Sequence, residues 1–576
     1  MKPQSFAPDA DQRAPVDGLS YVRGDASEPL SVQTIGELLD TAVERWPERV
    51  AAVFSEQAVR RNWRELQADV DRVAAGLLAL GLAKGDRIGI WAPNRYEWLL
   101  TQFATARIGL ILVNVNPAYR IAELEYALNK VQCKAIITAA SFKTSDYLKM
   151  LRDLAPELDA SQPGQLSAAR LPHLRWVIRM GDELSAGMLN FSGLAARASD
   201  ELIAQARALG ATLDCRDAIN IQFTSGTTGA PKGATLTHHN IVNNARCVAQ
   251  AMRLTQLDSL CIPVPLYHCF GMVLGVLACV ACGAAMVFPS EGFDPKTTLE
   301  AVASEGCTAL HGVPTMFIAE LDHPQFADFD LSTLRTGIMA GSPCPIEVMK
   351  RVVAEMHMGQ VTIAYGMTET SPVSFQSATD DSLDRRVSTV GRILPHLEVK
   401  IVDGDGNTVP VGGTGELCTR GYSVMQGYWN DGERTAESIR DGWMHTGDLA
   451  TIDSEGFCNI VGRVKDMLIR GGENVYPREI EEYLFGHPKI QQVQVFGVPD
   501  PKYGEEVCAW IVLKPGENAS EDEIRAWCRE RIAHYKVPRY VRFVQDLPMT
   551  VTGKAQKFVM RERMIKELNL TEAKTA

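Results

Sequence analysis

Apolar positions along the chain alternate between a helical spacing and short runs of the kind that form buried strands. Residues 32–46 and 62–81 repeat apolar side chains every three or four positions, as amphipathic helices do. Short apolar runs stand at 87–91 and 110–115, and a helical segment at 94–108 separates them. Strands that alternate with helices in this way predict parallel sheets made of βαβ units.

The alternation continues to about residue 364. We expect helices at 121–130, 314–321 and 345–357, and strands at 134–138, 218–223, 261–266, 309–312, 335–340 and 361–364. Small or polar residues follow the later strands, and open parallel sheets bind ligands beyond the carboxyl ends of their strands. These turns are therefore the expected lining of a site. Residues 155–215 contain one candidate strand, at 176–178, and receive no functional assignment.

The pattern changes after residue 387. Short alternating runs at 397–402, 415–419 and 457–461, separated by turns, predict a small antiparallel sheet. A smaller domain of about 110 residues, which is a common domain size, is expected beyond it. Its predicted elements are helices at 477–484 and 521–532 and strands at 491–498, 505–513 and 540–544.

Length and composition describe an ordinary globular protein. The 576 residues exceed what one core holds, and 46% are hydrophobic while 22% are charged. The formal net charge of −12 gives no sign of the basic face that nucleic-acid binding needs. Thirteen scattered cysteines, an odd number, favour a reducing compartment. Cys279 and Cys282 form a C-x-x-C in an apolar run, which favours core packing over a metal or redox site.

Two segments bear on location. The N-terminal stretch, 1–18, is rich in proline and aspartate without an apolar core, which predicts an extended tail and no signal peptide. Residues 270–288 lack any charge and imitate a membrane span. Glycines interrupt this run, so a buried helix followed by a buried strand at 284–288 is the better interpretation. We therefore expect a cytoplasmic protein with no integral membrane association.

A glycine- and threonine-rich loop, TSGTTGAPKG at 224–233, follows the predicted strand at 218–223 and precedes a helix predicted at 238–252. Glycines allow close approach of the backbone, and hydroxyls, free N–H groups and a lysine can bind an anion. The arrangement predicts a phosphate cradle between a strand and a helix. The spacing departs from G-x-x-x-x-G-K-[ST], so this is not a Walker A loop. The alternative is a flexible surface loop.

The loop resembles that of the adenylate-forming superfamily, which includes acyl-CoA synthetases, amino-acid adenylation domains and luciferases. Five more blocks occur in the family's order: YGMTET at 365–370, GEL at 415–417, TGD at 446–448, GR at 462–463 and GK at 553–554. The resemblance covers roughly residues 30 to 570. It implies an α/β fold: an extended tail (1–30), a large adenylation domain of mostly parallel sheets with a small antiparallel sheet (31–463), and a mobile α+β domain (464–576).

The resemblance also implies the site residues. Lys554, His268 and Glu369 would be catalytic, and Thr224 and Glu369 would hold Mg²⁺, for which oxygen ligands are suited. Lys465 would be the hinge between the domains. His268, Val313 and Met316 would line the acyl pocket, and Gly471, Gly472 and Glu473 would bind CoA. The ATP contacts would be Thr224, Ser225, Gly226, Thr227, Thr228, Gly229, Ala230, Pro231, Lys232, Gly341, Ser342, Pro343, Tyr365, Gly366, Thr368, Asp448, Arg463 and Lys554. Among them, the resemblance implies that Asp448, helped by Arg463, binds the ribose hydroxyls, and that residues 341–343 and Tyr365 pack on adenine.

Local similarities within the superfamily favour ligases that join medium-chain fatty acids to CoA. The segments concerned are LEY at 124–126, PLYHC at 265–269, GYSVM at 421–425 and 469–477. We expect an acyl-adenylate intermediate, ATP, Mg²⁺ and CoA as requirements, and a carboxylic acid as substrate; a homodimer is left open. An aryl-acid CoA ligase is the alternative within the class. A P-loop ATPase, from another class, would release ADP and phosphate instead of AMP and pyrophosphate.

Overall fold

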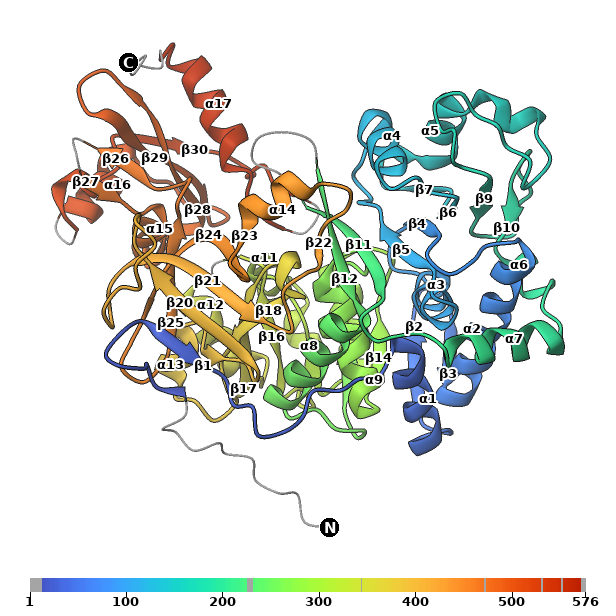
Figure 1. The fold of residues 1–576 in the computed structure, drawn as a ribbon. Helices are drawn as coiled ribbons and strands as arrows, with labels where there is room; N and C mark the ends of the chain where they lie inside the picture. Colours follow the sequence, from blue (N-terminus) through green and yellow to red (C-terminus); the bar gives the residue numbers. More distant parts are fainter. Residues whose placement is uncertain are drawn as a thin grey trace.

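The computed structural model describes residues 13–224, 231–342, 344–470, 473–529, 532–550 and 553–570. Within these ranges, two large sheets and their helices form one body, and a smaller sheet with its own helices follows at the C-terminal end (Figure 1). One continuous cluster of buried apolar side chains extends through the large body, while the C-terminal part has separate clusters. The predicted α/β fold with a small C-terminal α+β domain is confirmed.

The first large sheet carries the phosphate-loop segment. Its strands run parallel from β10 to β11, and β12 and β22 then add antiparallel at one edge. In order across the sheet they are β10 (Leu189–Asn190), β9 (Trp176–Arg179), β6 (Ala135–Thr138), β4 (Arg87–Trp91), β5 (Ile111–Asn114), β11 (Ala218–Thr224), β12 (Lys232–Thr237) and β22 (Gly427–Tyr428).

The second large sheet has a parallel centre with antiparallel strands at both edges. Its order is β19 (Arg392–Ile393), β18 (Val373–Gln376), β17 (Gln360–Gly366), β16 (Thr336–Ala340), β15 (Ala309–Leu310), β13 (Ser259–Cys261), β14 (Ala285–Phe288), β2 (Val50–Phe54) and β3 (Val59–Asn62). The parallel strands are buried on both faces, which explains their continuous apolar runs.

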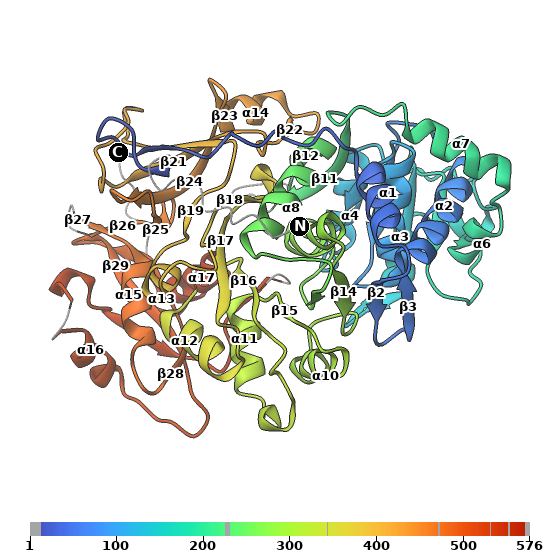
Figure 2. The same ribbon diagram turned by 90° about the horizontal axis from the view of Figure 1, so that it is seen from below.

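Helices fill the space between and around the two sheets. Helix α8 contacts β12 of one sheet and β18 of the other, and Figure 2 shows it beside both. Its first turn is fixed by a capping box between Thr237 and Asn240. The helices of the large body are α1 (Ile35–Arg45), α2 (Trp63–Ala79), α3 (Tyr96–Arg107), α4 (Ile121–Lys130), α5 (Tyr147–Leu154), α6 (Ser192–Ala195), α7 (Asp200–Gly210), α8 (His238–Ala251), α9 (Ala278–Cys282), α10 (Pro295–Glu305), α11 (Pro314–Leu321), α12 (Ile346–Glu355), α13 (Leu383–Ser388) and α14 (Gly432–Ser438).

The small antiparallel sheet predicted after residue 387 is present. Its strands are β1 (Tyr21–Arg23), β20 (Leu397–Val402), β21 (Gly415–Gly421), β24 (Trp443–Ile452), β23 (Ile439–Arg440) and β25 (Cys458–Arg463). Strand β1 comes from the segment expected to be an extended tail: it pairs antiparallel with β20, so residues 21–23 are part of this sheet.

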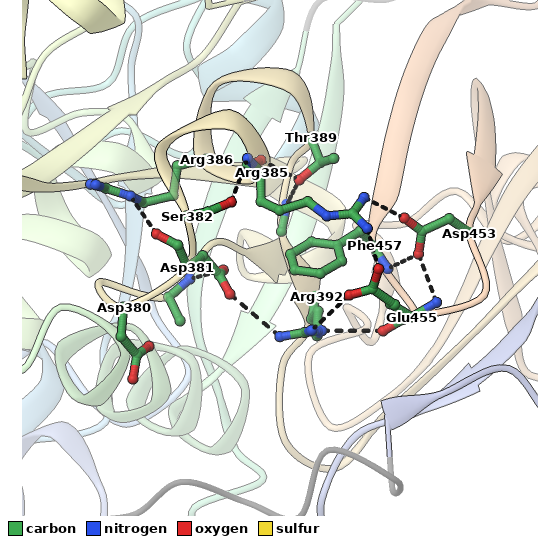
Figure 3. Close-up of polar contacts among 12 residues, drawn as sticks. Asp380, Asp381, Ser382, Arg385, Arg386, Thr389, Arg392, Asp453, Glu455 and Phe457 are labelled. Carbon is green, nitrogen blue, oxygen red and sulfur yellow. Dashed lines mark hydrogen bonds and ion pairs between the residues drawn. The ribbon is translucent and has the colours of Figure 1, made fainter.

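An arginine pair joins the small sheet to the edge of the second large sheet. The guanidinium carbons of Arg385 and Arg392 lie 4.6 and 3.9 Å from the ring centroid of Phe457 (Figure 3). Arg385 also pairs with Asp453 at 2.6 Å and with Glu455. Cations over an aromatic face are attracted to it. The turn between β24 and β25 is therefore fastened to α13 and β19 on the large sheet.

The C-terminal part follows the expected pattern. Its sheet contains β27 (Glu473–Val475), β26 (Leu468–Arg470), β29 (Gly504–Leu513), β28 (Ile490–Asp500) and β30 (Tyr540–Phe543). Helices α15 (Pro477–Phe485), α16 (Glu521–Arg529) and α17 (Lys557–Glu567) pack on it. Proline stands at the first position of α15, where a missing N–H has no consequence.

Two local predictions need correction. The strand and the helix of the phosphate-loop segment lie where they were predicted, but the helix does not follow the loop directly: residues 232–237 form an additional strand, β12, which pairs antiparallel with β11. The strand expected at 261–266 ends at Cys261. Pro263 and Pro265 explain this early end, because proline cannot donate to a strand ladder.

The uncharged run at 270–288 is a helix followed by a strand, as predicted. Its helix begins as a π-helix, η3 (Phe270–Leu277), continues as α9 and ends at Gly283 with φ of 79°, and β14 follows. The residues of η3 are all buried. Across the described ranges, no helix combines the length and the apolar character needed to cross a bilayer.

Candidate active site

Glu369 and Thr224, the predicted Mg²⁺ ligands, meet at the carboxyl ends of strands in the two large sheets. Thr224 ends β11, and Glu369 lies in the 3-10 turn η5 (Thr368–Thr370) just after β17. The Thr224 hydroxyl donates to Glu369 Oε1 over 3.1 Å. Glu369 is only 5% exposed, so its carboxylate is held largely by protein. A carboxylate beside a hydroxyl provides the oxygen donors that Mg²⁺ prefers.

The predicted phosphate-loop lysine stands directly across the hairpin from Thr224. Lys232 and Thr224 are paired in the β11–β12 ladder, and the Lys232 ammonium lies 4.8 Å from the ring centroid of Tyr428. Pro231 precedes β12 within the described residues. The other loop residues of the prediction, Ser225, Gly226, Thr227, Thr228, Gly229 and Ala230, lie outside the described residues, as do Pro343, Gly471 and Gly472.

Asp448, the predicted ribose ligand, lies on β24 with both carboxylate oxygens engaged. Tyr365, at the end of β17, donates its hydroxyl to Oδ2 over 2.7 Å, and Arg463 Nε donates to Oδ1 over 2.9 Å. Asp448 and Arg463 are also paired in the β24–β25 ladder. Asp448 is buried while Arg463 is exposed. Ionised groups make the stronger hydrogen bonds, so these three side chains hold one another in place.

The turns at Gly341 and Gly366, predicted to contact ATP, have backbones that need glycine. Gly341 has φ of 93°, and a Cβ there would lie 3.1 Å from Val313. A Cβ at Gly366 would lie 1.7 Å from the carbonyl oxygen of Pro372, which forbids any side chain. Thr368 is buried, while Ser342 is half-buried. Both glycines therefore lie at the carboxyl ends of β16 and β17, where the site was predicted.

His268 lies on the side of the site where the acyl pocket was predicted. It is half-buried, and Phe270 N–H donates to its Nδ1 over 3.2 Å, which leaves Nε2 to carry the proton of a neutral ring. Burial, with the nearby charge of Lys554, lowers the pKa of His268 to about 3. Val313 and Met316, at the start of α11, are buried apolar neighbours of this region. The ring is therefore a neutral polar group at neutral pH.

Lys554 reaches the same place from the C-terminal domain. A tight turn presents it: Gly553 has φ of 74°, and Lys554 N–H donates to the hydroxyl of Thr550 over 3.0 Å. The turn sits against the large body, since a Cβ at Gly553 would lie 2.9 Å from Val313 Cγ2.

The charges around Lys554 identify its neighbours. Partial desolvation and the nearby Arg463 guanidinium lower the pKa of Lys554, while Asp448 and Glu369 oppose this effect. The Lys554 side chain nevertheless remains exposed. Lys554 therefore lies close to Arg463, Asp448 and Glu369 while its side chain still reaches solvent.

The remaining predicted residues lie farther along the connection between the domains. Lys465 is exposed and is the second residue after β25, while Glu473 begins β27 and is exposed. Val464 N–H donates to the carbonyl of Gly447 over 2.9 Å, so the chain remains bound to the small sheet up to the residue before Lys465. The structure thus brings together Thr224, Lys232, Glu369, Asp448, Arg463, His268 and Lys554, and leaves Glu473 outside this group.

Tyr428 belongs to the site although the sequence analysis did not identify it. Its hydroxyl donates to Glu369 Oε1 over 3.0 Å, and its ring faces Lys232. It lies in a two-residue strand, β22, which shows no periodic pattern that could have revealed it. The only signal was its nearness to the GYSVM segment at 421–425, which carries the family resemblance.

Comparison with known proteins agrees with this geometry. Residues 39–429 match the AMP-binding enzyme family, and residues 479–554 match the AMP-binding enzyme C-terminal domain. The chain belongs to the AMP-binding enzyme family. Two similar family members are YngI of Bacillus subtilis, which is named as an acyl-CoA synthetase, and the mitochondrial medium-chain acyl-CoA ligase ACSF2 of Danio rerio.

These relatives match over nearly their whole lengths. YngI is 51% identical over 94% of this chain and 98% of its own length, and ACSF2 of Danio rerio is 50% identical over 96% and 91%. Among solved structures, the anthranilate CoA ligase AuaEII in complex with anthranoyl-AMP has a TM-score of 0.84 at 25% identity. It covers 94% of this chain and 99% of its own. The predicted membership in the adenylate-forming enzymes is confirmed.

Proposed function

We propose that this member of the AMP-binding enzyme family is an ATP-dependent acyl-CoA ligase that activates medium-chain fatty acids. Its relatives at about half identity are an acyl-CoA synthetase and medium-chain acyl-CoA ligases. The observation that carries the proposal is the seating of the Lys554 turn on Val313, beside His268. A lysine from the small domain thereby stands between the predicted acyl pocket and the nucleotide ligands.

The first step joins the acid to AMP. A carboxylate oxygen attacks the α-phosphorus of ATP, a new P–O bond forms, and the bond to pyrophosphate breaks. Both reactants are anions, so the site must supply positive charge where negative charge accumulates. Lys554 would bridge the carboxylate and the α-phosphate, Lys232 would face the departing phosphates, and Asp448 with Arg463 would hold the ribose. Neutral His268 would contribute a polar contact without adding charge near Lys554.

The donor set around Glu369 fits a magnesium ion. One carboxylate and one hydroxyl, Glu369 and Thr224, lie in contact at the strand ends, and Mg²⁺ commonly takes one or two protein oxygens beside phosphate oxygens. When bound, the ion would neutralise charge on the phosphates. Glu369 and Thr224 would hold it, and Tyr365 with Asp448 would fix the other end of the nucleotide.

The second step transfers the acyl group to CoA. The thiol sulfur, as thiolate, attacks the acyl carbon, a C–S bond forms, and AMP leaves with the electron pair of the broken C–O bond. The Lys554 turn packs against Val313, a residue of the predicted acyl pocket. We infer that the small domain (464–576) turns about Lys465 relative to the tail (1–30) and large domain (31–463), and brings Gly471, Gly472 and Glu473 to the thiol path.

The acid is inferred to be an alkyl acid because the predicted pocket is apolar. Val313 and Met316 are buried side chains of this kind, and η3 adds further buried apolar residues. An aryl acid is the second candidate, and the likeness to an anthranilate CoA ligase favours keeping it in the test.

The compartment is inferred to be one that keeps thiols reduced. All thirteen cysteines are free, as expected in such a compartment. The cytoplasm is the proposed location for this chain, although the ACSF2 relatives are named as mitochondrial. Cell fractionation with an antibody to the chain tests this directly, and recovery in an oxidising compartment would contradict it.

A product assay tests the function. Purified protein with ATP, Mg²⁺, CoA and a panel of straight-chain acids and aryl acids should yield AMP, pyrophosphate and acyl-CoA in equal amounts, with the highest kcat/KM for a medium-chain fatty acid. A higher kcat/KM for an aryl acid would assign the second candidate. Release of ADP and phosphate without acyl-CoA would exclude the ligase function.

A further inference from the structure

Four residues are linked in a closed circuit of contacts where β11 ends and β12 begins: Thr224, Lys232, Glu369 and Tyr428. Thr224 is paired with Lys232 across the β11–β12 ladder, and its hydroxyl donates to Glu369 Oε1 over 3.1 Å. Tyr428 donates to the same Oε1 over 3.0 Å. The ring of Tyr428 lies 4.8 Å from the Lys232 ammonium. Tyr428 therefore contacts both the predicted metal ligand and the predicted phosphate lysine.

We propose that Tyr428 is a positioning residue for metal and phosphate binding: its hydroxyl aligns the Glu369 carboxylate, and its ring holds Lys232. The proposal rests on the proposed ligase function, which gives Glu369 its role at the metal ion and Lys232 its role at phosphate. It makes a separate claim about binding, which can be measured without any acid substrate.

The backbone places Tyr428 firmly. It pairs with Ala234 in the ladder between β22 and β12, and the next residue, Trp429, donates its N–H to the carbonyl of Gly233 over 2.8 Å. Tyr428 N–H donates to the hydroxyl of Thr435 in α14 over 2.9 Å. The side chain is 6% exposed. A buried phenol on a paired strand has little freedom, so it can fix the groups that it touches.

The hydrogen bonds leave one carboxylate oxygen of Glu369 for a cation. Oε1 accepts from both Thr224 and Tyr428. No donor to Oε2 occurs among the described parts of the chain. The backbone is held as well, because Met425 N–H donates to the Glu369 carbonyl over 2.9 Å. Two hydroxyl donors on one oxygen thus orient the carboxylate and direct a metal ion to the other oxygen.

The aromatic ring of Tyr428 has a role that differs from that of its hydroxyl. An ammonium over a tyrosine ring is attracted by the ring electrons. Lys232 is thereby held near Glu369 and Thr224 before phosphate arrives, which reduces the side-chain entropy lost on binding. Removal of the hydroxyl alone and removal of the whole ring should therefore have separable effects.

Two substitutions separate these tasks. Tyr428→Phe keeps the ring and removes the hydroxyl; it should weaken binding of Mn²⁺, used as the metal probe, by about tenfold in the presence of α,β-methylene-ATP, because a hydrogen bond to a charged group is lost. Metal-free binding of the same analogue should stay within twofold. Tyr428→Leu removes both contacts and should also weaken the metal-free binding. Electron paramagnetic resonance measures Mn²⁺, and calorimetry measures the nucleotide.

Tyr422→Phe is the matched control. Tyr422 is another buried tyrosine nearby, but its hydroxyl accepts from Asn244 Nδ2 and does not touch Glu369. The control should bind Mn²⁺ as the wild type does.

The outcomes are distinct. Mn²⁺ binding within twofold of wild type in Tyr428→Phe would overturn the positioning role, and so would equal losses in Tyr422→Phe and Tyr428→Phe. If Tyr428→Leu does not fold, as judged by circular dichroism, the decision rests on the phenylalanine variant. A wild type that binds Mn²⁺ with nucleotide but makes no acyl-CoA would refute the ligase function while leaving this result intact.

Discussion

The hydroxyl of Tyr365 donates to Oδ2 of Asp448 over 2.7 Å, and so links the end of a large-sheet strand to the small antiparallel sheet. The residues are 83 positions apart in the chain. This contact joins the side of the site predicted to hold adenine with the side predicted to hold ribose. These two predicted nucleotide ligands are thus held in place by their own hydrogen bond.

Loss of the Asp448 carboxylate should weaken ATP binding. Asp448→Ala removes a charged acceptor from a buried position, a change of about 1.5–3 kcal/mol, or roughly ten- to a hundredfold in Kd. Tyr365→Phe, which leaves the carboxylate and removes one donor, should have a smaller effect. Calorimetric titration with ATP measures both. Unchanged affinity in Asp448→Ala would exclude a ribose contact.

The charge of Glu369 should matter more than its shape. Glu369→Gln preserves the volume and can still accept from Thr224, but a neutral amide is a poorer Mg²⁺ ligand. The Mg²⁺ concentration for half-maximal pyrophosphate release should rise by about tenfold or more, the size of one charged hydrogen bond or metal contact. A Mg²⁺ titration identical to that of the wild type would remove Glu369 from the metal site.

Lys554 and Lys465 should affect different half-reactions. Lys554→Ala removes a charge needed mainly in the transition state of adenylation, so kcat for that step should fall by at least about a hundredfold. Preformed acyl-AMP and CoA should still react at close to the wild-type rate. Lys465→Pro fixes φ at the proposed pivot and should impair the thioester step more than adenylation. Single-turnover assays separate the steps, and equal damage to both in both variants would contradict domain alternation.

Adenylation should depend on pH through Lys554. Partial desolvation, and then Arg463, lower the pKa of this amine, so it loses its proton at a lower pH than an ordinary lysine. Because the charged form is the active one, kcat/KM for pyrophosphate release should fall as pH rises through that pKa. Lys554→Arg, if active, should extend the plateau to higher pH. A profile without an alkaline limb in the wild type would contradict this role.

Glu320 should destabilise the protein at neutral pH. It lies in α11, is 1% exposed, and neither carboxylate oxygen has a hydrogen-bond partner among the described residues. Burial raises its pKa well above the usual value. The folded state therefore binds a proton that the unfolded state has lost, and stability falls as pH rises from about 4.3, the unfolded value, to the folded pKa.

Glu320→Gln removes this titration. Thermal unfolding of the variant should depend less on pH between 5 and 8 than that of the wild type, with the gain in stability growing toward pH 8. Glu347→Gln, at an exposed position of α12, is the control and should change little. If both variants show the same pH dependence as the wild type, the Glu320 carboxylate does not carry a raised pKa.

The sequence was sufficient to predict the elements whose apolar residues recur with a strong period, and the motifs that occur in the family's order. Strands such as β4 and helices such as α4 begin and end where the apolar pattern indicates. It failed at β12, where lysine, glycine and threonines offer no strand pattern, and pairing with β11 decides the structure. It could not reveal Tyr428, because β22 is a strand only through its partner from a distant part of the chain.

The late position of β22 in the chain has a consequence for synthesis. The edge of β12 remains unpaired until residues 427–428 have left the ribosome, since these residues alone complete that edge of the sheet among the described strands. Contacts so distant in sequence form slowly, and an open strand edge invites pairing with other chains. Nascent chains that end before residues 427–428 would thus expose an aggregation-prone edge and lack Tyr428, the tyrosine proposed to position the phosphate lysine.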